Sequence, residues 1–355
     1  METLFKRLSA FSATIILLIL TSIFVVLFIY AKPAIKEYGI KFLVDPRWGV
    51  VVENQVSSTQ IQSSIDASIN SDTSINDDEN IPTDSDIPTD SDIPTDSDIP
   101  MDSDLVGQDN DVPTDSDVLA QTNDSTKAKV IYGGLIPIVG TILSTLIAMF
   151  FAVPVAMGIA IFLSEIAPPF VAKPVGIAIE LLAAIPSIIY GMWGLFYFGP
   201  FVAKIFGGSS VSLLVAGLVL GIMIIPFMAS LTRDSMNTTP NVLKESAYAM
   251  GATKFEVIKD VIFPYAKKGI IGSMILALGR ALGETMAVAF VIGGVFNLPK
   301  KLTDPTVSIP VVLANNFAES SGMSLSALFY LALILFVISF IVISFAKFYF
   351  LRDKK

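Results

Sequence analysis

The chain has 355 residues, of which 53% are hydrophobic and only 15% charged, and its formal net charge is −9. Soluble globular domains carry about 25% charged residues, so this composition excludes an ordinary soluble protein. Because the sequence contains no cysteine and no histidine, it also excludes a disulfide framework, a thiolate metal site and a Ser-His-Asp triad, and we expect neither catalytic residues nor a metal site.

Six apolar blocks are long enough to cross a bilayer. A membrane-spanning helix needs about 20 mostly apolar residues, because the hydrocarbon core is about 30 Å thick and a helix rises about 1.5 Å per residue. The predicted spans are Ala10–Tyr30, Leu135–Leu163, Val175–Phe198, Val211–Leu231, Gly269–Phe296 and Leu325–Phe350. Lipid offers no partner to unpaired backbone groups, and the blocks are too long and too uniformly apolar for barrel strands. We therefore predict an all-α integral membrane protein.

The first span is predicted to be a retained anchor, although Lys6 and Arg7 precede it as in a signal peptide. Its apolar run exceeds the roughly 7 to 15 residues of a signal core, and the residues around Tyr30 make a poor cleavage site. The predicted division of the chain is a tail with the first helix (1–30), an extracytoplasmic loop (31–133), a helical core (134–350) with a cytoplasmic loop at 233–268, and a cytoplasmic tail (351–355).

The loop at 31–133 holds 21 of the 32 acidic residues and only six basic ones. It contains the sequence IPTDSD three times in succession from Ile81 to Asp98, followed by two variants that end at Asp117. Proline at every sixth position blocks helices and strand ladders, and the Asp and Ser content offers little apolar area, so we predict a disordered tether. Weak binding of divalent cations is the alternative, but the glycine and closing glutamate of an EF-hand are missing.

Prolines interrupt the second, third and fourth spans at Pro154, Pro186 and Pro226. A proline frees a backbone carbonyl about one turn earlier, which predicts kinks beside a cavity, although prolines are common in membrane helices. Glu180 is an acid near the start of the third span. It is a candidate for a transport pathway, or else it reaches toward the membrane interface.

The cytoplasmic loop between the fourth and fifth spans contains Glu245, Ala247, Gly251 and Pro264 at offsets that resemble the coupling motif of ABC importer permeases. Its local chemistry predicts a short helix from Val242 to Met250, a left-handed turn at Gly251 and a second helix from Thr253. A helix-turn-helix of this kind fits a groove on a soluble partner. The alternative interpretation of this segment is an ordinary amphipathic surface loop. The chain has no G-x-x-x-x-G-K-[ST] phosphate loop, so ATP hydrolysis must come from another subunit.

Arg280 and Glu284 lie within the predicted fifth span. An arginine inside a membrane costs several kcal/mol on insertion scales, so it normally faces the bundle interior or a water-filled path. The two residues are four apart on one helix face and can pair, and Gly279 and Gly283 let a neighbouring helix approach. A guanidinium fork suits tetrahedral oxyanions such as phosphate, and the alternative is a purely structural ion pair.

Basic residues favour an orientation with both termini in the cytoplasm. With the N-terminus inside, 13 of the 23 Lys and Arg residues fall on the cytoplasmic side and nine outside, and Arg280 is within a span. Six of the 13 lie in the short loop between the fourth and fifth spans, which the positive-inside rule therefore places in the cytoplasm.

Five segments together resemble the PstC-type permeases of phosphate ABC importers, over about Leu135 to Phe350. They read GIAIFLSEIAP from Gly158, ELLAAIPSIIYGMWGLF from Glu180, IMIIPFMASLTRD from Ile222, ESAYAMGAT from Glu245 and LGRALGETMAV from Leu278. The resemblance implies a MetI-like permease fold of six helices in the bacterial cytoplasmic membrane. It says nothing of the acidic repeat, which is not part of the family pattern.

The same resemblance implies the partners. They are a second, PstA-type permease, two copies of an ATPase that binds ATP and Mg²⁺, an extracytoplasmic phosphate-binding protein, and membrane lipid, but no nucleic acid. Glu245, Ala247 and Gly251 would dock in the ATPase, and Arg280 and Glu284 would be required for phosphate passage. This chain itself would hold no cofactor.

Three other readings remain open. Arg280 suits another oxyanion such as sulfate or molybdate equally well, so only the family-specific motif favours phosphate. A secondary transporter could use Arg280 and Glu284 as a proton-coupled pair, but it would have no ATPase for the cytoplasmic loop to engage. A sensor or adhesin based on the acidic loop would leave the charged fifth span unexplained.

Overall fold

The computed structural model describes residues 2–52 and 129–351, and it divides the chain into two units, residues 1–50 with 131–355 and residues 51–130. The acidic repeats therefore lie outside the described residues. The first helix, α1 (Glu2–Tyr38), continues past the predicted end at Tyr30 and is followed by the short helix η1 (Gly39–Leu43). Strand β1 (Trp48–Val52) then pairs with β2 (Lys129–Tyr132), where the description resumes.

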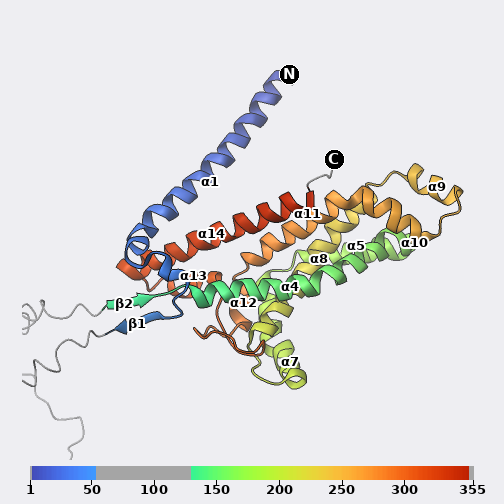
Figure 1. Cartoon of the computed structure of the whole chain (residues 1–355). Coiled ribbons are helices and arrows are strands. Elements are labelled where there is room, and N and C mark those ends of the chain that lie inside the picture. Colours follow the sequence, from blue (N-terminus) through green and yellow to red (C-terminus); the bar gives the residue numbers. More distant parts are fainter. Residues whose placement is uncertain (1, 53–128, 352–355) are drawn as a thin grey trace, which may run out of the picture. The chain divides into compact units, whose positions relative to one another are not determined.

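Helices α4 (Leu135–Ile161) and α8 (Leu213–Asn237) form the centre of the first unit (Figure 1). A stripe of alanines on α4 is fully buried, with one alanine in every fourth position from 148 to 160. On α8, a Cβ added at Gly217 would come within 2.6 Å of Ile147 Cγ2. Small residues on both helices thus permit the close approach that packs membrane helices together.

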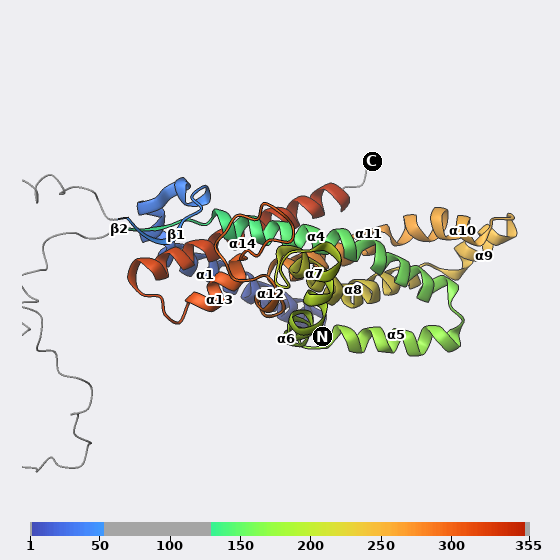
Figure 2. The ribbon, with the colours of Figure 1, turned by 90° about the horizontal axis from the view of Figure 1, so that it is seen from below.

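The third predicted span is wrong in its extent, because the chain breaks at Pro186. Helix α5 (Pro169–Ala183) ends before this proline, and α6 (Ser187–Trp193) begins directly after it in another direction, so that Figure 2 shows α5 lengthwise and α6 nearly end-on. A proline disfavours the helical conformation of the residue before it, and its ring clashes with the preceding turn of a helix. The candidate span here runs over residues 187–206, through α6, η3 (Gly194–Phe198) and α7 (Gly199–Phe206).

The fifth predicted span also differs. One continuous helix begins with α10 (Lys254–Glu256), passes through the π-helical segment η4 (Val257–Ile262) and continues as α11 (Phe263–Leu282). Pro264 stands at its π-to-α junction, where the wider turn accommodates a residue without an N–H group. The helix ends at Gly283, and α12 (Met286–Val291) is a separate short helix. The predicted span to Phe296 is therefore too long at its C-terminal end.

The last part of the chain covers α4 and α1. Helix α13 (Ile309–Asn316) is held against α4 by the backbone N–H of Ile309, which donates to Thr141 Oγ1 at 2.8 Å. Residues 306–312 are buried. Helix α14 (Gly322–Leu351) packs along α1, with the rings of Tyr30 and Phe329 stacked at 4.9 Å.

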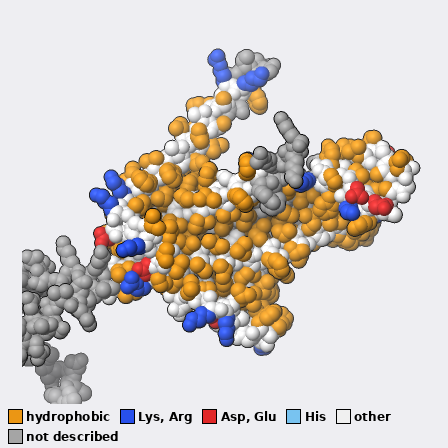
Figure 3. Space-filling view, in the orientation of Figure 1, with side chains coloured by type: hydrophobic (Ala, Val, Ile, Leu, Met, Phe, Trp, Pro, Cys, Tyr) orange, Lys and Arg blue, Asp and Glu red, His pale blue; other side chains and the backbone are white. Residues whose placement is uncertain are grey.

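Among the described residues, six helical stretches are long and apolar enough to cross a membrane. Their outward side chains are largely hydrophobic: Figure 3 shows apolar side chains over the lengths of α4, α11 and α14, with charged side chains near the ends. Helix α8 is the exception, because 67% of its most apolar window is buried. The protein thus presents apolar side chains both to its core and to its surroundings, as expected in lipid.

Candidate functional sites: the charged helix end and the cytoplasmic loop

The first candidate site is the end of α11 with Arg280, in the last turn of the helix. Its guanidinium carbon lies 5.4 Å from the centre of the Phe227 ring on α8, a cation–π distance. Tyr190 on α6 lies close enough for an electrostatic interaction with Arg280. The three residues come from three different helices, so the half-buried arginine faces the bundle interior rather than lipid.

Glu284 does not form the expected pair with Arg280. Gly283 ends α11, so Arg280 and Glu284 do not share one continuous helix face. Glu284 Oε1 instead accepts a hydrogen bond from the backbone N–H of Ala287 at 3.1 Å, which caps the start of α12. In the part of the chain that the structure describes, no ion pair joins the two residues. The donors of Arg280 are thus not occupied by Glu284 and can meet an oxyanion.

A groove of about 470 Å³ adjoins this helix break. It is lined by Gly283 and Thr285 on one side and by α13 and α14 on the other, through Pro310, Leu313, Ala314, Phe317 and Leu335. The broken backbone of residues 283–285 therefore lines a cavity, which is where irregular backbone is tolerated at membrane depth.

The second candidate site is the segment between α8 and α11, predicted to be a cytoplasmic loop, and its predicted local structure is confirmed. Helix α9 spans Asn241–Ala249, Gly251 adopts the left-handed conformation with φ of +88°, and Thr253 caps the next helix. The cap is reciprocal: Thr253 Oγ1 accepts a hydrogen bond from the Glu256 backbone N–H at 3.4 Å, and Glu256 Oε2 accepts one from the Thr253 backbone N–H at 2.7 Å. Local chemistry alone was sufficient to predict this turn.

The residues of the coupling motif do not cluster into a pocket. Glu245, Gly251 and Pro264 are exposed, whereas Ala247 packs against a small apolar cluster that includes Met236, Val257 and Ile262. No residue of α9 is fully buried. Several apolar side chains at this end of the molecule are exposed: Val242 (70%), Tyr248 (45%) and Met250 (89%). Such a rim of exposed apolar side chains is typical of an interaction surface.

An ion pair that the sequence did not reveal holds α9 in place. Lys244 Nζ lies 2.6 Å from Glu165 Oε1, in the segment η2 (Phe162–Ile166) that ends α4, and their side chains are only 17% and 9% exposed. The partners are 79 residues apart in the sequence. No local pattern indicates such a pairing, because it depends on how α4 and α8 pack.

Glu180 on α5 pairs with Arg233 near the C-terminal end of α8 and does not join Arg280. Its Oε1 lies 3.0 Å from Arg233 Nη2, and the same nitrogen lies 3.2 Å from Asp234 Oδ1. Glu180 and Arg233 also line a groove of about 360 Å³ together with Lys173. The structure therefore separates Glu180 from the other two candidate residues of the substrate path.

Known proteins resemble this chain in sequence. Permease proteins of phosphate transport systems named PstC are 49% identical over 244 residues in Pasteurella multocida (63% of this chain, 76% of the relative) and 50% identical over 232 residues in Haemophilus influenzae (60% and 74%). A probable PstC of Methanocaldococcus jannaschii is 38% identical over 234 residues (61% and 74%). A chain of the inward-facing MetNI methionine ABC transporter is 19% identical with a TM-score of 0.49, covering 59% of this chain and 90% of that one.

The family model for inner membrane components of binding-protein-dependent transport systems matches residues 130–352. The match contains the charged end of α11, the cytoplasmic loop and five of the six candidate spans. The chain belongs to the family of binding-protein-dependent transport system inner membrane components.

Proposed function

We propose that this chain is the permease subunit through which an ATP-driven ABC importer moves inorganic phosphate across the cytoplasmic membrane. The observation that carries the proposal is the 49% identity with the phosphate permease PstC of Pasteurella multocida. The permease core adopts a MetI-like fold, both termini are cytoplasmic, and the segment at 31–133 is an extracytoplasmic loop. Six candidate spans and the cytoplasmic cluster of basic residues support this arrangement.

Arg280 binds the phosphate anion during its passage. A half-buried guanidinium whose donors Glu284 leaves unoccupied offers a planar fork to two oxygens of a tetrahedral anion, and reduced hydration strengthens that interaction. Glu284 contributes to the path by fixing the start of α12 beside the arginine. Glu180 contributes at the cytoplasmic end, where its ion pair with Arg233 lines a groove through which a released anion can leave.

The cytoplasmic loop docks in a separate ATPase subunit, present in two copies, which binds ATP and Mg²⁺. Helix α9 presents Glu245 and exposed apolar side chains to that partner, and Gly251 sets the direction of the turn that follows. A second permease of the PstA type completes the membrane pair, and an extracytoplasmic binding protein delivers phosphate. This chain contributes no cofactor of its own.

One helix connects the two candidate sites. The continuous stretch over residues 254–282 begins at the capped turn after α9 and ends at the turn that carries Arg280. A rigid helix with one end at the ATPase and the other at the substrate can convert closure of the ATPase dimer into a displacement of the arginine. Alternating access then follows as a two-state rearrangement that ATP and phosphate bias from opposite ends.

The test is uptake of radiolabelled phosphate by cells that lack their own high-affinity system and express this chain with its neighbouring transporter genes. Arg280→Gln should abolish uptake while the complex still co-purifies. Arg47→Gln is the matched control, because Arg47 is an exposed arginine that pairs with Asp45 outside the candidate spans. Unchanged uptake in Arg280→Gln would reject the transport role of this residue.

Uptake by the same cells also tests which anion is the substrate and which energy source drives its transport. An assembled complex that takes up sulfate or molybdate but not phosphate would establish the other oxyanion permease. Uptake that survives ATP depletion but collapses with the proton gradient would establish a secondary carrier. ATP-dependent phosphate uptake supports the proposal against both.

A further inference from the structure

A groove of about 620 Å³ lies between the end of α4 and the start of the long helix that leads into α11. Its wall is apolar and consists of Ile161, Ile166, Phe255, Ile258 and Phe263. The volume is within the range of about 300 to 1,000 Å³ that is usual for small-ligand sites. Phe255 and Ile166 are 71% and 52% exposed, so these two side chains of the wall are not covered by the described part of the chain.

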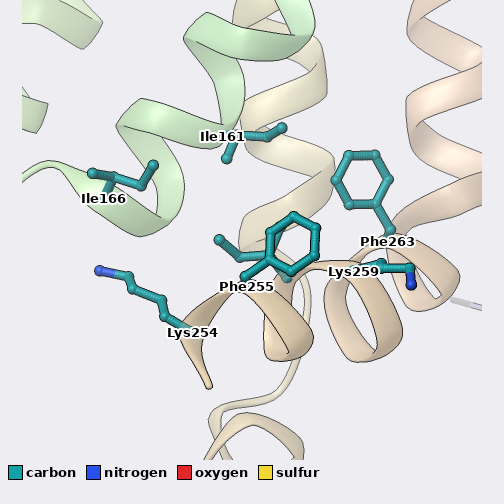
Figure 4. Close-up of a pocket in the computed structure, with 7 residues that line it drawn as sticks. Ile161, Ile166, Lys254, Phe255, Lys259 and Phe263 are labelled. Atoms are coloured by element: carbon teal, nitrogen blue, oxygen red, sulfur yellow. The ribbon is translucent and has the colours of Figure 1, made fainter. Parts of the chain in front are cut away.

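Two lysines complete the groove. Figure 4 shows Lys254 and Lys259 on opposite sides of the Phe255 ring, with Ile161 and Ile166 on the facing helix. Both lysines are exposed, and in the described residues neither forms a salt bridge. The groove therefore combines an apolar wall with two positive charges at its edge.

The acidic residues around the groove do not neutralise these lysines. Glu165 is engaged by Lys244, and Glu256 is engaged by the backbone and hydroxyl groups of Thr253. Asp260 follows Lys259 in the sequence but does not line the groove. An occupant that satisfies the site must therefore bring its own negative charge next to an apolar part.

The groove is also at the depth of a lipid headgroup. One candidate span ends at Ile166 and another begins at Lys254, and both residues line the groove. A lysine at a span end extends its amine toward the interface, where the phosphates of the bilayer lie. The apolar wall then continues from the headgroup level toward the hydrocarbon core.

We propose that this groove binds one anionic phospholipid of the cytoplasmic leaflet, with its negatively charged headgroup at the edge that carries Lys254 and Lys259 and an acyl chain along Ile161, Ile166 and Phe255. The leaflet follows from the orientation given under the proposed function. The lipid covers apolar side chains next to the turn from which α9 projects. It thus fills the space between the coupling loop and the membrane.

The experiment uses the assembled importer reconstituted in vesicles of equal parts phosphatidylglycerol and phosphatidylcholine. After gentle extraction, native mass spectrometry counts the lipids that remain bound. One phosphatidylglycerol should stay bound in preference to phosphatidylcholine. Lys254→Gln with Lys259→Gln should reduce that preference about thirtyfold, because each lysine near the surface contributes several-fold to the binding of an anionic lipid.

Two further variants make the result specific. Ile166→Trp fills the groove from an exposed position and should remove the bound lipid even though both lysines remain. Lys267→Gln with Lys347→Gln removes the same charge from exposed lysines that do not line the groove, and should leave lipid retention unchanged.

Several outcomes would overturn the proposal. Equal retention in all variants, or equal retention of the two lipids by the unmodified complex, would show that no anionic site exists here. Retention by the membrane subunits that disappears once the ATPase subunit is added would assign the groove to that protein. Normal phosphate uptake with no bound lipid would reject the lipid site and leave the proposed function intact.

Discussion

The ion pair between Lys244 and Glu165 is expected to keep helix α9 attached to the bundle. Helix α9 has no fully buried residue, so its attachment depends on this pair and on the packing of Ala247 and Ala252 against the small apolar cluster. The two charged atoms are 2.6 Å apart and their side chains are mostly shielded from water. Removing one partner leaves the other charge buried without compensation.

Neutralising either residue, by Lys244→Gln or Glu165→Gln, should therefore lower the free energy of opening α9 by about 2 kcal/mol. This value is at the low end of the range for a buried charge pair, because neither side chain is completely enclosed. This corresponds to an increase of about thirtyfold in the population of the detached helix. The double variant should open α9 less than either single variant does, because it leaves no uncompensated buried charge.

Hydrogen exchange of the amides at residues 241–252 in the assembled complex measures this population. Each single variant should exchange about thirtyfold faster there and unchanged in α8. Asp45→Asn, which removes an exposed pair with Arg47 far along the sequence, serves as the control and should leave α9 unaffected. Less than a twofold change in both single variants, or additive effects in the double variant, would refute the assigned role of the pair.

Three other predictions concern the turn at Gly251, the packing of α4 against α8, and the Asp45–Arg47 pair. Gly251→Val should weaken co-purification of the ATPase, because a β-branched residue at a φ of +88° destabilises the turn by at least about 1 to 2 kcal/mol and forces it into another conformation. The control is Gly272→Val, because Gly272 is a helical glycine with open space around it. Gly217→Val should lower thermal stability by about 1 to 3 kcal/mol, since the new side chain meets Ile147, and differential scanning fluorimetry measures the shift. The Arg47 side chain donates hydrogen bonds that hold the pKa of Asp45 below its ordinary value. The resulting stabilisation is present above the unfolded pKa of about 3.9 and is lost as pH falls through the folded pKa, so protease resistance of residues 39–48 should fall at acidic pH in the unmodified chain and lose this dependence in Asp45→Asn.

Local chemistry was sufficient for the features that depend on neighbouring residues. The apolar blocks predicted where the chain crosses the membrane, because the hydrocarbon core imposes a minimum length on every span. The structure of the loop around Gly251 was also predictable, because it depends on neighbouring residues: Gly251 tolerates a positive φ, and Thr253 and Glu256 cap each other within four residues.

Hydropathy misjudged the limits of the third and fifth spans. It averages over a window and does not register where a helix changes direction, so the break at Pro186 and the end of α11 at Gly283 were both included within longer apolar blocks. The break at Gly283 takes Glu284 off the helix face of Arg280. The expected ion pair is thereby replaced by a cap on α12.

Composition, hydropathy and motif spacing by themselves determined that the chain is a helical membrane protein with a left-handed turn at Gly251 between two helices. Tertiary structure alone decided which partner each charged side chain meets: Lys244 meets Glu165, Arg233 meets Glu180, and Arg280 meets the ring of Phe227. Charge pairing at short range depends on the relative placement of helices, which is set by packing of small residues between α4 and α8. A charge on one helix finds its partner only once that packing has brought the two helices together.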